Sequence, residues 1–109
     1  MTSDEFNLIV EDVFDKCKNV LIEKAKEYVL DKNDRLKAFK LEYLNCPINS
    51  KETLWGALVK HITSVYDMCK QGPEFDKTHL DQWDAKIIDI INYMVLLKGI
   101  VIDNANNRK

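Results

Sequence analysis

The apolar run IIDIINYMVLLKGIVI, residues 87–102, decides the fold of this 109-residue chain. Wound as a helix, it is apolar around nearly its whole circumference, and only a narrow strip through Asp89 and Asn92 is polar. A helix of this kind is buried on several sides, so we expect it at the centre of a helical bundle or at an interface between subunits. The run has only 16 residues and contains Lys98 besides the polar strip, which argues against a membrane span.

Three amphipathic segments precede this run and predict three further helices. Apolar residues recur in them at intervals of three and four. Gly72 and Pro73 form a strong stop after the third segment, so we expect a loop over 72–78 before the last helix begins at Thr78. The expected helices run from residue 3 to a bend at 31–35, over about 35–44, from 49 or 50 to about 71, and from 78 to about 103.

These elements predict an all-α protein, a bundle of about four helices of which the second is short. We expect a single helical domain over residues 1–103 and a frayed polar tail over 104–109. The apolar circumference of the last helix predicts a homo-oligomer, a dimer or higher, with that helix near the interface. The alternative is a monomeric bundle in which the same helix is central.

Composition narrows the class of protein. Sixteen basic and eighteen acidic residues are interspersed, so a dedicated nucleic-acid-binding module is not expected. The three cysteines are far apart, which is typical of reduced thiols in the cytoplasm, and two histidines provide no zinc-ligand spacing. We expect no cofactor. The start, MTSDEF, has no apolar segment of a signal peptide.

Polar side chains on inward helix faces are the candidate functional residues, because burying an unpaired polar group is costly. His61 lies in the middle of the apolar side of LVKHITSVYDM, residues 58–68, while Lys60 and Asp67 lie on the opposite flank. We expect His61 to be buried and hydrogen-bonded across helices, and Lys60 and Asp67 to be exposed. The inward polar set suggests a ligand-binding cleft between helices. Its candidate ligand-binding residues are Lys24, Glu27, Arg35, His61, Asp89 and Asn92, with no catalytic or metal role assigned.

Each candidate also has a structural interpretation. Lys24 can extend its stem to bring its ammonium group into water, and Arg35 can form a local ion pair or helix cap. His61, Asp89 and Asn92 can form a hydrogen-bond network that fixes helix register. Four aromatic residues could stack on a base but are expected to pack in the core: Trp55, Tyr66, Trp83 and Tyr93.

Four segments resemble a family of small phage and prophage proteins: KAKEY, NDRLKAF, LWGALVKHITSVYDM and KIIDIINYMVLL. They lie between residues 24 and 97. The resemblance implies a phage origin and a location in the cytoplasm of the bacterial host cell. It names no activity.

The end of the last helix, DIINYMVLL, is similar to the second metal-binding helix of the MazG-like all-α nucleotide pyrophosphohydrolases. That family holds magnesium with E-x-x-E and E-x-x-D pairs on two helices. The similarity implies Glu27, Asp67 and Asp89 as metal ligands. The present chain has Lys86 three residues before Asp89, and its acids Glu23 and Glu27 are four apart.

Three functions follow as hypotheses. The first, which we favour, is a phage-encoded, non-enzymatic binding protein that acts in counter-defence by sequestering a nucleotide-type signal or inhibiting a host immune protein. The second is a MazG-like magnesium-dependent pyrophosphohydrolase. The third is a structural or regulatory helical module whose polar residues only fix packing.

Overall fold

The computed structural model describes residues 1–28 and 50–107. In these ranges the chain forms four helices and no strand, which confirms the all-α class. The helix expected over 35–44 and the tail end at 108–109 lie outside the described residues. The helices are α1 (Ser3–Tyr28), α3 (Ser50–Cys69), α4 (Pro73–Thr78) and α5 (Leu80–Asn107).

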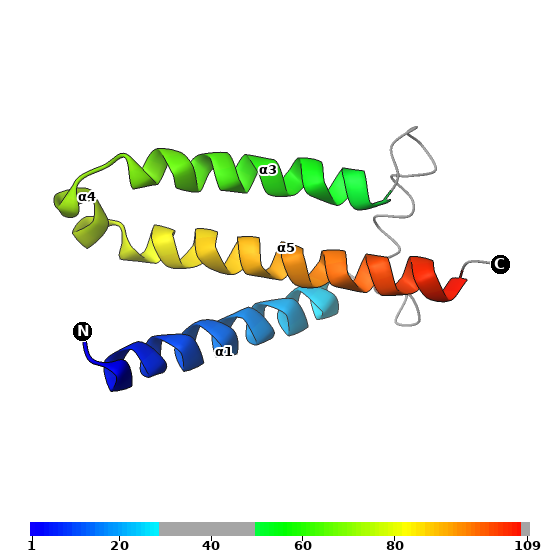
Figure 1. Cartoon of the computed structure of the whole chain (residues 1–109), viewed down its shortest axis with the longest axis horizontal. Helices are drawn as coiled ribbons and strands as arrows, with labels where there is room; N and C mark the ends of the chain where they lie inside the picture. The colour runs from blue at the N-terminus through cyan, green and yellow to red at the C-terminus, as the bar shows by residue number, and fades with distance from the viewer. Residues whose placement is uncertain (29–49, 108–109) are drawn as a thin grey trace.

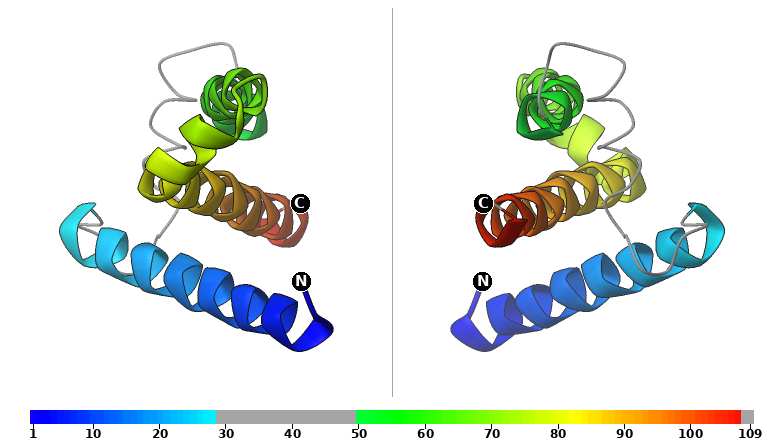
Figure 2. Two further views of the ribbon diagram at one scale, coloured as in Figure 1. Left: turned by 90° about the vertical axis from the view of Figure 1, so that its left-hand side faces the viewer. Right: turned by 90° about the vertical axis from the view of Figure 1, so that its right-hand side faces the viewer.

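Helix α5 is the central element of the described chain. It runs antiparallel to α3, and the short α4 lies at the turn between them (Figure 1). Helix α1 crosses α5 on the side away from α3, as the end-on views show (Figure 2). Helix α5 packs against each of the other three helices. The apolar run at 87–102 therefore lies at the centre of the bundle, as its sequence predicts. No described helix is long and apolar enough to cross a bilayer.

The boundary of α1 follows from a reciprocal cap. The backbone N–H of Glu5 donates to Thr2 Oγ1 (3.1 Å), and the backbone N–H of Thr2 donates to Glu5 Oε2 (2.9 Å). This capping box satisfies two N–H groups that the first turn would otherwise leave unpaired. The helix consequently begins at Ser3, as expected from the sequence.

The expectation of a loop over 72–78 is wrong, because Pro73 begins the short helix α4. Proline at the first position of a helix loses no hydrogen bond and has the helical φ already. Helix α4 ends at Thr78, whose hydroxyl donates to the carbonyl of Glu74 (2.9 Å). The Trp83 indole N–H donates to Asp76 Oδ1 (3.0 Å), which ties α4 to the first turn of α5.

Two boundaries of α5 also differ from the expected ones. The helix begins at Leu80 instead of Thr78, after a turn in which the ring of His79 stacks on that of Phe75 with centroids 3.9 Å apart. It continues to Asn107, so the segment 104–107, expected to fray, belongs to the helix. Helical hydrogen bonding therefore extends past the last apolar residues of the run.

The core of the described chain is small. Helices α3 and α5 are in antiparallel register, because Gln82 lies beside Met68 and Asp89, seven residues further on, lies beside His61, seven residues earlier.

The radius of gyration is 16.5 Å, compared with about 13 Å for a compact domain of this length, so the molecule is elongated. The buried apolar side chains are Cys17, Leu54, Leu58, Met68, Ile88 and Ile100.

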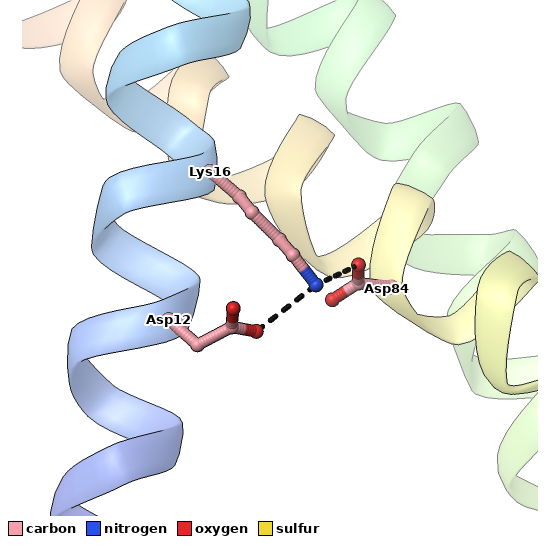
Figure 3. A network of polar contacts seen from close by, with 3 residues as sticks. All are labelled: Asp12, Lys16 and Asp84. Carbon is pink, nitrogen blue, oxygen red and sulfur yellow. Dashed lines mark hydrogen bonds and ion pairs between the residues drawn. The ribbon is translucent and has the colours of Figure 1, made fainter.

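A polar contact joins α1 to α5 at the rim of this core. Lys16 Nζ lies 2.9 Å from Asp84 Oδ2 on α5 and 3.0 Å from Asp12 Oδ2 on its own helix (Figure 3). Hydrogen bonds to both carboxylates raise the pKa of Lys16. Next to it, burial and the nearby charge of Asp84 raise the pKa of the Cys17 thiol, which keeps that thiol protonated and unreactive.

Candidate functional site

His61 and Asp89 approach each other across the α3–α5 interface. His61 Nδ1 lies 3.9 Å from Asp89 Oδ2, and the two side chains are 25% and 34% exposed. This distance suits an ion pair when the imidazole is protonated but exceeds that of a hydrogen bond. The imidazole also packs on the ring of Tyr93, with centroids 5.0 Å apart and planes inclined at 40°. His61 is thus half-buried and in contact with the helix expected from the sequence. The expected hydrogen bond across the helices is not formed within the described residues, because Nδ1 has no hydrogen-bond partner there.

Asn92 is a buried amide with unpaired polar atoms. Its side chain is 6% exposed, and neither Oδ1 nor Nδ2 has a hydrogen-bond partner in the part of the chain that the structure describes. On α5 it projects about 80° from Asp84, which faces α1, and about 60° from Asp89, which faces α3. The amide therefore points into the region between the three long helices. His61 Nδ1 is likewise buried and has no hydrogen-bond partner within residues 1–28 and 50–107.

The structure brings together only part of the predicted ligand-binding set. His61, Asp89 and Asn92 lie on the facing helices α3 and α5, as expected. Lys24 differs from the expectation of an inward side chain, because it is exposed. Glu27 lies on α1, but its side chain and the whole of Arg35 are outside the described residues.

The flank of α3 opposite the core is solvated, as predicted. Lys60 and Asp67 are exposed, and Asp67 Oδ1 lies 3.8 Å from Lys70 Nζ one turn along the helix. The magnesium set suggested by the MazG similarity has Asp67 on this flank, whereas Asp89 lies beside His61. Within residues 1–28 and 50–107, no three His, Cys, Asp or Glu side chains gather closely enough to hold a metal ion.

The sequence did not reveal the most exposed apolar feature of α3. Helix α3 has two apolar faces: one, with Leu54 and Leu58, is buried, and the other faces solvent. The outer face carries side chains at the i, i+4, i+7, i+11 spacing of one helix stripe. We call this the α3 stripe: Trp55 (52% exposed), Val59 (39%), Ile62 (40%) and Tyr66 (62%).

Two of the four aromatic residues expected in the core belong to this stripe. Trp55 and Tyr66 are exposed, while Trp83 and Tyr93 are half-buried. Lys70 Nζ lies 4.4 Å above the ring of Tyr66, a cation–π contact that leaves the ring on the surface. The sequence contains a signal for this exposed face: the residues of the α3 stripe each follow a position of the buried face by one residue. Its spacing is as regular as that of the core face.

Comparison with known proteins places the chain in no family: no protein-family model, no curated protein and no solved structure matches it significantly.

Proposed function

We propose that the protein is a non-enzymatic binding protein that presents the α3 stripe to an apolar groove on another protein. The exposed aromatic stripe is the observation that carries this proposal. Isolated apolar side chains on a surface need no explanation, but an aligned set of four on one helix face marks an interaction site.

The chemistry of the stripe suits recognition of a helix by a groove. A helix that binds in this way supplies anchors at i, i+4, i+7 and i+11, which is the spacing from Trp55 to Tyr66. Tryptophan and tyrosine are enriched among the residues that contribute most to protein–protein binding. Each exposes more than half of its surface here, so a partner can still bury that area. Because α3 is anchored to α5 by its other, buried apolar face, the stripe is already helical before binding, which lowers the entropy cost.

The partner that we propose is a host immune protein, with the chain acting as a phage counter-defence factor in the bacterial cytoplasm. The resemblance of four segments to phage and prophage proteins supports this assignment. Inhibition by a small helical protein requires only that it occupies a surface its target needs, which is compatible with the exposed stripe and requires no catalytic group.

The test is a binding measurement on stripe variants. A tagged protein is used to capture partners from a bacterial lysate, each captured protein is identified and purified, and its Kd is then measured by calorimetry. Trp55→Ala and Tyr66→Ala should each weaken binding by about 30-fold, which corresponds to about 2 kcal/mol at a central interface aromatic. Leu8→Ala is the matched control, because Leu8 is equally exposed but lies on α1.

Two results would contradict the proposal. Equal affinities of the wild type and both stripe variants would place the binding site elsewhere on the chain. Equal weakening of the complex by Leu8→Ala and by Trp55→Ala would show that losing exposed apolar area anywhere on the chain reduces affinity, and that the α3 stripe has no specific role. Circular dichroism of each variant confirms that α3 remains folded.

Binding of a nucleotide-type ligand is the second candidate function. The polar atoms of His61 and Asn92 that lack hydrogen-bond partners in the described chain favour it, because a ligand that donates and accepts hydrogen bonds would satisfy them. Asn92 is buried, so such a ligand must part α5 from a neighbouring helix. A thermal shift with nucleotides and cyclic nucleotides that is lost in His61→Ala would support this function. Unchanged melting at millimolar ligand would exclude it.

A further inference from the structure

The first half of α1 carries a second exposed apolar face. Cys17 on this face is 4% exposed against α5, whereas Phe6 is 55% and Phe14 is 61% exposed. Toward its N-terminus α1 diverges from α5 in both viewing directions (Figures 1 and 2). The face therefore continues beyond the part that the bundle covers. We call its uncovered part the α1 face: Phe6, Ile9, Val10 and Phe14.

Charge along α1 is divided between its two halves. Residues 3–15 contain five acidic and no basic residues, whereas residues 16–26 contain four lysines and a single glutamate. A second α1 helix placed parallel to the first would set acid against acid over the exposed half. A second α1 placed antiparallel would set the acidic half of each copy against the basic half of the other.

From this complementarity we propose that the α1 face is covered by the α1 helix of a second copy, with the two helices antiparallel about a two-fold axis near Phe14, so that residues 6–10 of one copy lie opposite residues 18–22 of the other. In this register Glu11 of one copy lies opposite Lys18 of the other, and the pair occurs twice by symmetry. Both residues project on one flank of the apolar face, about 20° apart around the helix. Both are exposed in the single chain.

The area of the α1 face agrees with a dimer of modest affinity. An aromatic side chain offers about 200 Å² and the aliphatic ones less, so the exposed fractions amount to about 350 Å² of apolar surface per copy. Interfaces are about 60% apolar, which implies about 1,200 Å² buried in total, at the lower end of specific interfaces. A helix of 26 residues is about 39 Å long, enough to carry this area.

A shallow hollow at the N-terminal end of α1 fits the same arrangement. It measures about 300 Å³ and is lined by residues 1–3, Phe6 and Asn7. With the axis near Phe14, the stretch around Leu21 and Ile22 of the second copy lies opposite this hollow. Apolar side chains of one copy would thus fill a depression in the other, at both ends of the helix pair.

The experiment is sedimentation equilibrium of the full chain over a range of protein concentrations. We expect a monomer–dimer equilibrium that Phe6→Glu combined with Phe14→Glu shifts at least 30-fold toward monomer. Leu8→Glu, the control, places one such charge at an apolar residue on the other side of α1 that is at least as exposed, and it should leave the equilibrium unchanged. Circular dichroism verifies helix content.

Charge reversal tests the antiparallel register. Glu11→Lys and Lys18→Glu should each weaken the dimer, and the double variant should restore it, because each change alone opposes like charges twice. The two residues are two helical turns apart and do not contact each other within one chain, so restoration reports contact between copies. A monomeric wild type, a dimer that persists with both phenylalanines replaced, or a double variant weaker than either single one would overturn the proposal.

Discussion

Replacing Asn92 by Leu should stabilise the protein. The Asn92 side chain is 6% exposed with both polar atoms unpaired in the described chain, and a buried polar group without a partner costs about 1–3 kcal/mol. Leucine has the same branched arrangement of four side-chain heavy atoms as asparagine, so it should fit the space between the helices with limited strain. We expect the free energy of unfolding to rise by about 1–3 kcal/mol, and Tm by about 4 °C for each kcal/mol.

Urea unfolding followed by circular dichroism measures this difference, at one fixed protein concentration because the proposed dimerisation would also affect stability. Asn104→Leu is the control, since Asn104 is exposed on the same helix and its replacement should change stability by less than about 0.5 kcal/mol. If Asn92→Leu instead destabilises the protein by more than about 1 kcal/mol, the amide has a hydrogen-bonding partner in solution. The reasoning from unpaired atoms would then be wrong.

Two further predictions concern the backbone of α3 and the thiols. Gly56→Ala should raise the free energy of unfolding by about 0.5–1 kcal/mol, because a Cβ there meets no atom within 4 Å and glycine is a poor helix former; an unchanged or lower urea midpoint would contradict this. Burial and the charge of Asp84 raise the pKa of Cys17, whereas Cys69 is exposed, so alkylation at pH 8 followed by peptide mass spectrometry should modify Cys69 much faster. Faster modification of Cys17 than of Cys69 would disprove the burial of Cys17. The pKa of Cys17 is higher in the folded than in the unfolded chain, so its contribution to the free energy of unfolding is complete below the ordinary thiol pKa of about 8.5 and falls as pH rises above that value.

The sequence was sufficient to predict the central helix. Residues 87–102 are apolar on almost every side, and a position between other helices buries more of that surface than a position at the edge, although several of these side chains, Met94 and Val95 among them, stay exposed. The same periodicity placed His61 and Asp89 on facing sides, so their approach at 3.9 Å follows from the pattern once α3 and α5 are antiparallel. These predictions succeeded because burial of apolar area dominates the energy of the fold.

Other features could not be read from local patterns. Gly72-Pro73 ends one helix, but Pro73 is equally suited to begin another, and the choice depends on the contact of Trp83 with Asp76. Periodicity shows that Trp55 and Tyr66 share a face, yet it does not tell which of two apolar faces the rest of the chain covers. Lys24 lies on an apolar face by spacing, but its long stem allows the charge to reach water.

The order of the helices along the chain has a consequence for the order of folding. Helices α3, α4 and α5 are consecutive in the sequence, so their contacts close only short loops and can form early. Helix α1 is separated from α3 by more than twenty residues and meets α5 through few groups, among them Lys16 and Cys17. We therefore expect the helical hairpin of α3 and α5 to form first, and docking of α1 to be a later and more easily reversed step.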